Sequence, residues 1–206
     1  MYADFASAQV VEDVLPMIRN RGELSDLVRN TAHQTLVGKD WRPPVKSKWT
    51  MNLVRTRPYA ILKGDLPDFT SFTAYYVLED GLLLMDWKAT TAFSSSSYEE
   101  LSQGKGDGSE VRAYLKPANF YTNDFPEDEY HCYQVVSPDK RQLLWGYVKR
   151  SSDLAQVLGR FYLKGQILEE GSRELPMTLE LSRPLGKSLP NQWLIESLLH
   201  EEWIRL

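Results

Sequence analysis

The chain has 206 residues, of which 42% are hydrophobic and 25% charged, and its formal net charge is −4. These values are typical of a globular protein that buries about 70% of its unfolded surface on folding. The acidic balance argues against nucleic acid as the main partner, because lysine and arginine hold phosphates. The one cysteine, Cys132, excludes an internal disulfide and a zinc site made of thiolates.

The first 38 residues have a helical pattern. Apolar and small residues recur on one face at i, i+3, i+4, i+7, i+8 and i+11, and they are Leu24, Leu27, Val28, Thr31, Ala32 and Thr35. Gly38 is a suitable helix end. We therefore expect residues 1–38 to be helical and Pro43-Pro44 to enforce an extended connector after them.

From about residue 50 the hydrophobic period changes to two, which is typical of strands. Asp80-Gly81 is a strong hairpin signal between strands expected at residues 72–79 and 82–89. In that register one face collects the apolar residues Phe72, Ala74, Tyr76, Leu78, Leu83, Met85, Trp87 and Ala89. Asp86 then projects from the other face, level with Tyr75.

The second half of the chain alternates strands and helices. A capping box at Ser97-x-x-Glu100 predicts a short helix, and Ser151-Ser152-Asp153 predicts the start of another. We expect strands at 111–116, 130–136, 142–149 and 177–182, and a last helix at 191–200. The whole is predicted to be a single α+β domain spanning 1–206, with an antiparallel meander over 50–150 and a helix-strand-helix extension over 151–206.

Asp86 is a candidate catalytic group. If the face that it shares with Tyr75 lined a cavity, burial would raise the carboxylate pKa, and Asp86 could act as a general base beside that tyrosine. The alternative is architectural, with the carboxylate bonded to a loop backbone or to a partner such as Arg112. No Walker spacing or G-x-S-x-G element occurs, so we expect no cofactor.

The stretch from 119 to 133 combines aromatic and acidic residues. Phe120, Tyr121 and Phe125 are candidates for contact with a ligand, and the neighbouring acids are Asp124, Glu127, Asp128 and Glu129. Hard metals bind such oxygens, but the alternating spacing and glycine of a calcium loop are absent. We therefore expect a solvated acidic loop and no metal site.

The stretch from 39 to 57 carries six basic residues and one acid, with tryptophans between them. Trp41, Arg42 and Trp49 are the binding candidates here, since cations beside aromatic rings suit acidic ligands. The alternative is a solvated connector whose charges serve solubility.

The order of short helices followed by an antiparallel meander resembles the cystatin-like architecture, which includes the ketosteroid-isomerase and nuclear-transport-factor group. The resemblance covers residues 1–150 and depends on element order. In the isomerases of that group an Asp base works with a Tyr and a protonated Asp, which implies Asp86 and Tyr75 here, but no second acid is identified. Many members are binding or assembly modules without catalytic activity.

Four segments, LLLMDWKA, VRAYLKPANFYTNDF, LWGYVKRSS and TLELSRP followed by WLIESLLHEEWIRL, are similar to a family of uncharacterised bacterial proteins that carry them in this order. In these proteins the four segments often follow an N-terminal membrane anchor. The resemblance implies a location at the cell envelope and no particular activity.

We therefore expect a non-enzymatic binding or assembly domain, with a small-molecule isomerase or lyase that uses Asp86 as the alternative. The partner is a protein or a small molecule rather than nucleic acid, and a homo-oligomer is compatible with the sequence. The longest apolar runs are too short to cross a bilayer, so no transmembrane segment is expected in this chain. The expected location is cytoplasmic, or the cell envelope by way of an anchor outside this chain.

Overall fold

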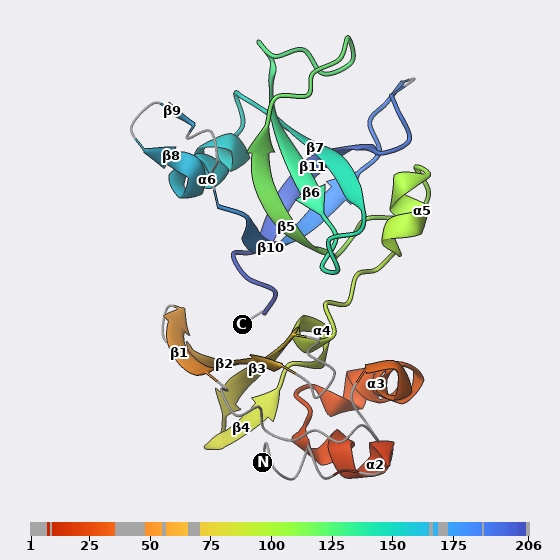
Figure 1. Cartoon of the computed structure of the whole chain (residues 1–206), viewed down its shortest axis with the longest axis vertical. Helices are drawn as coiled ribbons and strands as arrows, with labels where there is room; N and C mark the ends of the chain where they lie inside the picture. Colours follow the sequence, from red (N-terminus) through yellow and green to blue (C-terminus); the bar gives the residue numbers. More distant parts are fainter. Residues whose placement is uncertain are drawn as a thin grey trace. The chain divides into compact units, whose positions relative to one another are not determined.

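The computed structural model of the chain describes residues 8, 10–35, 48–54, 57–65, 71–164, 167–168, 173–186 and 188–204. The fold is α+β, with few helices and mainly antiparallel sheets (Figure 1). The chain divides into two compact units, Met1–Thr91 and Ala92–Arg205. The strands expected as one antiparallel meander over 50–150 belong to two separate sheets.

The first unit places helices before a four-stranded antiparallel sheet. The helices are α2 (Val11–Val14), the 3-10 helix η1 (Leu15–Met17) and α3 (Arg21–Thr35). The strands, paired in chain order, are β1 (Lys48–Val54), β2 (Arg57–Asp65), β3 (Ser71–Glu79) and β4 (Leu82–Met85). The expected sequence of helices followed by a meander is present within this unit.

The hairpin of β3 and β4 has the predicted register, with Tyr76 opposite Met85. The prediction that its second strand continues to Ala89 is wrong, because β4 ends at Met85 and helix α4 (Trp87–Thr90) follows. Asp86 is the reason. Its carboxylate accepts a hydrogen bond of 2.9 Å from the backbone N–H of Ala89, which makes it the N-cap of α4.

One face of the four-stranded sheet packs with the helices in a single core. The sheet contributes Ala60, Leu62, Ala74, Tyr76 and Met85, and the helical segment contributes Val11, Val14, Ile18 and Val28. Trp87 completes this core and donates its indole N–H to the hydroxyl of Thr31 in α3 at 2.9 Å. The predicted core face of the hairpin is thus confirmed at Ala74, Tyr76 and Met85 and is wrong at Leu78, which is 45% exposed.

The second unit is a closed five-stranded barrel. Its strands are β5 (Val111–Ala118), β6 (Tyr130–Val136), β7 (Leu143–Lys149), β10 (Leu175–Ser182) and β11 (Gln192–His200). Around the barrel they follow the order β5-β6-β7-β11-β10, and β10 closes onto β5. The β7–β11 pair is parallel and the others are antiparallel.

Short elements join these strands. They are α5 (Tyr98–Ser102) before the barrel, then α6 (Asp153–Tyr162) and the small pair β8 (Leu163–Lys164) and β9 (Ile167–Leu168) between β7 and β10. Both predicted helix starts are confirmed, by the capping box of Ser97 with Glu100 and by α6. Counted along the chain, the barrel strands therefore have the order 1-2-3-5-4, with helix α6 after the third strand.

The helix predicted at residues 191–200 is wrong, because β11 occupies this segment and closes the barrel. Its pairing with β10 is interrupted by two register shifts, between Thr178 and Leu179 and between Glu180 and Leu181. Such bulges disturb the alternation of a strand. The spacing of the apolar residues Leu194, Ile195, Leu198 and Leu199 therefore resembles that of a helix. The last element of the expected helix-strand-helix extension is thus a strand instead of a helix.

The barrel interior is filled by alternate residues of its strands. The inward side chains are Val111, Ala113, Leu115, Tyr133, Val135, Leu144, Val148, Met177, Leu179, Leu181, Trp193 and Ile195. Gly146 of β7 is required by this packing, since a Cβ there would lie 2.8 Å from side-chain atoms of Ile195 and Val135. At the end of α6, Tyr162 is buried and donates its hydroxyl to the carbonyl of Leu115 at 2.7 Å.

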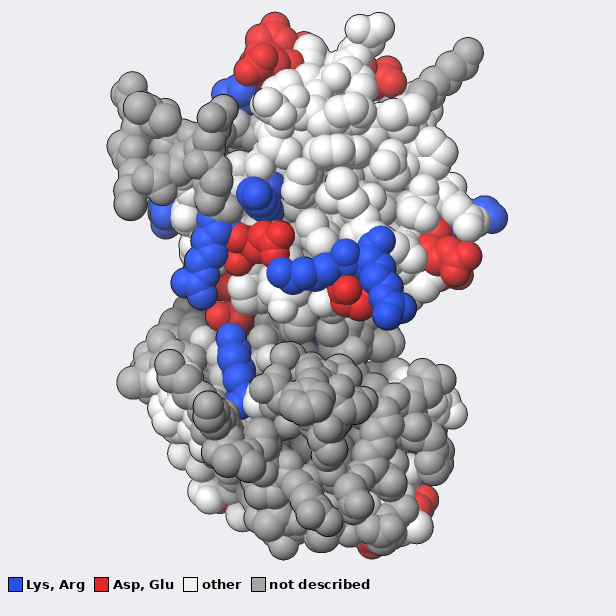
Figure 2. All heavy atoms as spheres, viewed as in Figure 1, with Lys and Arg blue, Asp and Glu red and all other residues white. Residues whose placement is uncertain are grey.

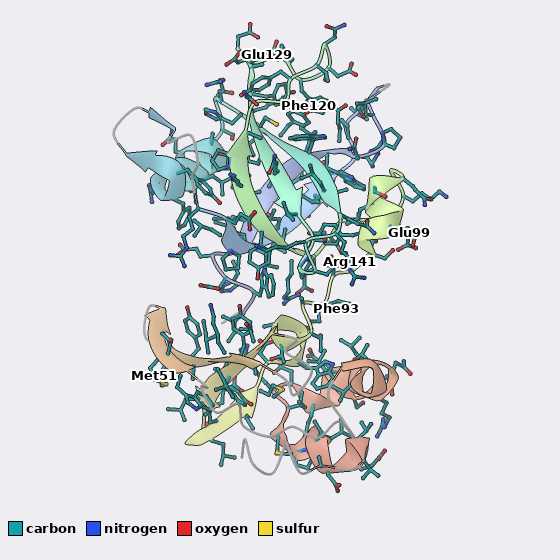
Figure 3. The ribbon with its side chains drawn as sticks, in the orientation of Figure 1. Met51, Phe93, Glu99, Phe120, Glu129 and Arg141 are labelled. Atoms are coloured by element: carbon teal, nitrogen blue, oxygen red, sulfur yellow. The ribbon has the colours of Figure 1, made fainter. Side chains whose placement is uncertain are left out.

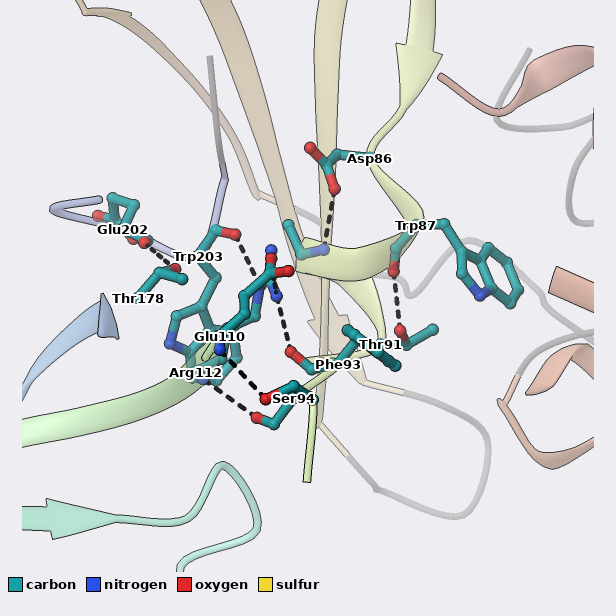
Figure 4. A network of polar contacts seen from close by, with 12 residues as sticks. Asp86, Trp87, Thr91, Phe93, Ser94, Glu110, Arg112, Thr178, Glu202 and Trp203 are labelled. Carbon is teal, nitrogen blue, oxygen red and sulfur yellow. Dashed lines mark hydrogen bonds and ion pairs between the residues drawn. The ribbon is translucent and has the colours of Figure 1, made fainter. Parts of the chain in front are cut away.

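Arg112 of β5 is buried and joins distant segments of the second unit (Figure 4). Its Nε donates to the carbonyl of Trp203 at 2.8 Å, and its Nη1 donates to the carbonyl of Phe93 at 2.7 Å. Nη1 also lies 2.9 Å from the carboxylate of Glu110. One side chain therefore fixes the start and the end of this unit against β5.

Candidate functional site

Asp86 is buried, with 7% of its surface exposed, and both of its carboxylate oxygens have partners. Oδ1 accepts from the backbone N–H of Ala89, as Figure 4 shows, and Oδ2 lies 3.3 Å from Nη1 of Arg19. Arg19 also donates from Nε to Glu79 at 2.6 Å. Asp86 therefore caps a helix and completes an ion-pair network in the first unit.

Tyr75 is buried next to Asp86 in the hairpin, and its carbonyl accepts a hydrogen bond of 2.8 Å from the Asp86 backbone N–H. The backbone N–H of Tyr75 donates to the hydroxyl of Thr90 at 3.0 Å. The sequence therefore identified two residues that are neighbours, and the bonds between them run through the backbone.

The basic segment is described in part. Trp41 and Arg42 lie outside the described residues. Trp49 lies on β1, is 44% exposed, and has its ring centroid 5.5 Å from that of Tyr76. Figure 3 labels Met51, the next residue on the same face of β1, which is also exposed.

The aromatic loop between β5 and β6, residues 119–129, lies over the outer face of the barrel. Phe125 stacks on Tyr147 of β7 with a centroid distance of 3.9 Å and an interplanar angle of 3°. Cys132 is buried in the same cluster, and the Tyr147 hydroxyl donates to the carbonyl of Phe120 at 2.9 Å. The three predicted aromatic candidates, Phe120, Tyr121 and Phe125, are thus brought together around strands β6 and β7.

Gln192, at the start of β11, connects this loop to the loop between β10 and β11. Its amide nitrogen donates to the hydroxyls of Tyr147 at 2.9 Å and Thr122 at 3.3 Å. Its amide oxygen accepts from the backbone N–H of Leu189 at 2.8 Å. Gln192 is buried and all of these bonds are internal, so it holds the two loops in fixed positions beside the outer face.

The outer face also includes Trp145 and Gln134, which the sequence does not predict as site residues. They are direct cross-strand neighbours on β7 and β6, and both are half-buried. Phe120 stacks on Trp145 with a centroid distance of 4.5 Å and an interplanar angle of 25°. We call the half-buried outward residues Phe120, Gln134, Trp145 and Leu194 the aromatic surface. Period-two alternation in LLWGYVK could have indicated Trp145, since it places this residue opposite to Leu144 and Gly146.

The polar groups of the aromatic surface are unused inside the protein. In the described part of the chain, neither the indole N–H of Trp145 nor the side-chain amide of Gln134 has a hydrogen-bond partner. Three other tryptophans differ in this respect. Trp87 donates to Thr31, Trp193 donates to the Leu101 carbonyl at 3.0 Å, and Trp203 donates to the Ala113 carbonyl at 3.2 Å.

Burial changes the ionisation of several groups around the aromatic surface. It raises the pKa of the Cys132 thiol to about 11 and also raises the pKa of the Tyr147 hydroxyl. The pKa of His131 is lowered, first by burial and then by the nearby positive charge of Arg150. All three groups are therefore neutral at pH 7, which keeps the buried side of the cluster uncharged.

The outer face of β6 and β7 carries no charge between its ends. Its outward residues are Cys132, Gln134, Val136, Leu143, Trp145 and Tyr147. Figure 2 shows an uncharged area on the barrel unit, with acidic side chains at its upper edge and both acidic and basic side chains toward its lower edge. The acids of the aromatic loop are Asp124, Glu127, Asp128 and Glu129, all exposed. Among the described residues, no group of three or more His, Cys, Asp and Glu side chains is arranged to hold a metal ion.

The helices in the described part of the chain are all too short or too polar to span a bilayer. Comparisons of the chain with models of protein families, with curated proteins and with solved structures found no match.

Proposed function

We propose that the chain is a non-enzymatic binding or assembly protein, and that its ligand binds to the aromatic surface of the barrel unit. The unused indole N–H of Trp145 is the observation that carries this proposal. Buried tryptophan N–H groups usually find a partner inside the protein, as those of Trp87 and Trp193 do here, whereas the N–H of the half-buried Trp145 is left for solvent or a ligand. A free donor beside stacked rings and a free amide offers a ligand both apolar area and directed hydrogen bonds.

The strand order supports the same surface by analogy. Barrels of the oligonucleotide/oligosaccharide-binding topology bind ligands on the face of their second and third strands, between the first-to-second and fourth-to-fifth loops. In this chain these are β6, β7 and the two loops that Gln192 connects. A shared topology does not determine a ligand. The proposal is therefore based on the residues of the aromatic surface, and the strand order is additional support.

The second candidate is a small-molecule isomerase or lyase with Asp86 as its base and Tyr75 beside it. A general base must reach the substrate proton with a free carboxylate oxygen. Both oxygens of Asp86 are engaged, by the N–H of Ala89 and by Arg19. This engagement favours the binding protein over the enzyme.

The proposal extends to the location and to the first unit. We also propose a place at the cell envelope, on the resemblance of the four segments named in the sequence analysis to segments of anchored bacterial proteins. The order of helices and meander in residues 1–91 supports a cystatin-like arrangement for that unit alone. A homo-oligomer is compatible with this assembly role.

Isothermal titration with three probe classes tests the proposal: a basic peptide, a neutral oligosaccharide and a single-stranded oligonucleotide. We expect one class to bind, and Trp145→Ala to weaken that binding about tenfold by loss of the stacking surface and the donor. Trp145→Phe, which keeps a ring, should lose less. Leu82→Ala, which changes an exposed residue of the other unit, is the control. Equal binding by Trp145→Ala and the unchanged protein would contradict the proposal.

A further inference from the structure

The proposed binding surface combines features that select one class of ligand. The rings of Phe120 and Trp145 stack on one another and are both half-buried, so the ring faces that the stack leaves uncovered form an aromatic platform. The face of an aromatic ring is electron-rich and attracts cations, with tryptophan the strongest and arginine the commonest partner. This platform therefore favours a ligand that carries a guanidinium or ammonium group.

The loop that supplies Phe120 adds negative charge next to this platform. It contains four exposed carboxylates, those of Asp124, Glu127, Asp128 and Glu129. No ion pair joins any of the four to another part of the chain that the structure describes. Figure 3 labels Phe120 and Glu129 at the same end of the barrel.

The basic residues at the base of the loop leave these carboxylates unpaired. Arg150 donates from Nε to the backbone carbonyl of Glu127 at 2.6 Å, and its own N–H donates to the Glu129 carbonyl at 2.8 Å. Lys149 is exposed at the end of β7. The four carboxylates of the loop outnumber the two cations, Lys149 and Arg150, so the loop has a negative net charge. These carboxylates repel one another, and a bound cation would reduce that repulsion.

The same surface disfavours phosphate. The outward residues of β6 from Cys132 to Val136 and of β7 from Leu143 to Tyr147 are uncharged, so no lysine or arginine of these strand segments lies under a bound strand. Nucleic-acid binding gains most of its affinity from such residues. A neutral glycan would stack on the rings but would gain nothing from the acidic loop.

The free polar groups fit a peptide backbone. The amide of Gln134 offers a donor and an acceptor, which can pair with the C=O and N–H of one peptide group. The indole N–H of Trp145 can donate to a neighbouring carbonyl. The two side chains are cross-strand neighbours, so they would contact adjacent parts of an extended chain.

We propose that the ligand of the aromatic surface is an extended basic segment of a partner protein. An arginine or lysine side chain lies on the rings of Trp145 and Phe120, the peptide backbone bonds to Gln134, and further cations face the acidic loop. This inference depends on the proposed function and names the partner class for the same surface.

Fluorescence anisotropy with a labelled ten-residue peptide of alternating arginine and alanine tests the inference. The same peptide with glutamate in place of arginine, chitohexaose and a ten-nucleotide thymidylate are the competing probes. We expect the arginine peptide alone to bind, with an affinity that falls as salt concentration rises, because the attraction is between exposed charges.

Two variants separate the contributions of charge and stacking. Neutralising the loop with Asp124→Asn, Glu127→Gln, Asp128→Asn and Glu129→Gln together should weaken peptide binding about tenfold. The control removes the same four charges elsewhere, with Glu23→Gln, Asp80→Asn, Glu99→Gln and Glu201→Gln, all exposed positions, and should bind at close to the original affinity. Trp145→Ala should also weaken binding about tenfold, and Trp145→Phe by less.

The outcomes are distinguishable. Binding of chitohexaose or thymidylate through Trp145, without binding of the arginine peptide, would overturn the basic-segment inference and leave the proposed surface standing. Equal losses in the loop variant and in its charge-matched control would also overturn it, because general electrostatics would then explain the affinity. Absence of binding by every probe would overturn both proposals.

Discussion

The guanidinium of Arg19 lies 3.3 Å from the carboxylate of Asp86, which at the same time caps helix α4. The two residues are 67 positions apart in the chain, so the contact ties the segment after η1 to the end of the β3–β4 hairpin. A carboxylate that first suggests a catalytic base is therefore a structural link within the first unit.

The two roles of Asp86 can be separated by substitution. Asp86→Ala removes the cap and the ion pair, and we expect the free energy of unfolding to fall by about 1–2 kcal/mol. Asp86→Asn keeps an oxygen that can accept from the Ala89 N–H, so its loss should stay below about 1 kcal/mol. Urea denaturation followed by circular dichroism measures both. Equal losses in the two variants would show that the cap contributes nothing.

Gly146 tests the packing of the barrel interior. Gly146→Ala places a Cβ 2.8 Å from atoms of Ile195 and Val135, which is closer than packed carbon atoms approach. We expect a loss of about 1–3 kcal/mol from overpacking. Gly22→Ala in α3, where a Cβ meets nothing within 4 Å, is the matched control and should be neutral or stabilising by up to about 1 kcal/mol. A Gly146→Ala variant as stable as the original chain would contradict the described packing.

The ion pair between the buried Arg112 and the partly buried Glu110 suits a double-mutant cycle. Arg112→Met leaves the carboxylate of Glu110 and two backbone carbonyls without their donor, and we expect a loss of about 3–5 kcal/mol in unfolding free energy. Adding Glu110→Gln to the Arg112→Met variant should cost little more, because the unpaired charge is then removed. Additive losses from the two substitutions would argue against a direct pair.

Cys132 reports on burial beneath the aromatic surface. It is 2% exposed, and its pKa is raised from 9.0 to about 11. The folded thiol therefore holds its proton to higher pH than the unfolded thiol. The contribution of the protonated Cys132 thiol to the free energy of unfolding is therefore complete below pH 9, and it is lost as the pH rises from 9 to 11.

Thiol labelling measures the same effect. At pH 8 the folded protein should have a thiolate fraction about a hundredfold lower than the unfolded chain, and its reaction with Ellman's reagent should be at least that much slower. Because Cys132 is the one cysteine in the sequence, the signal needs no mutagenesis. Rapid labelling of the folded protein at pH 8 would contradict the described burial of Cys132.

Local signals in the sequence predicted much of the fold. The Asp80-Gly81 hairpin with its register, the capping box of Ser97 with Glu100, and the start of α6 are confirmed, because each depends on residues near one another in the chain. The alternation does not predict the end of β4, because it continues through Asp86 to Ala89. Aspartate is also a common N-cap, and this second property of Asp86 is the local signal for α4.

Long-range pairing explains the larger differences. β11 is a strand because it closes the barrel between β7 and β10, and apolar spacing broken by bulges cannot reveal such partners. The aromatic loop was predicted as a candidate site from Phe120, Tyr121 and Phe125. Trp145 and Gln134 were missed, since their place beside Phe120 follows from the β6–β7 register and the fold of the loop.

The most direct test of the proposed binding surface is the indole region of a ¹H–¹⁵N correlation spectrum during titration with the alternating arginine–alanine peptide. The signal of Trp145, assigned through its loss in Trp145→Phe, should shift with a saturating dependence on peptide concentration. The signal of Trp87, whose indole is bonded to Thr31 beside the Asp86 cap, should stay in place. A shift of the Trp87 signal with an unchanged Trp145 signal would contradict the account and return attention to Asp86.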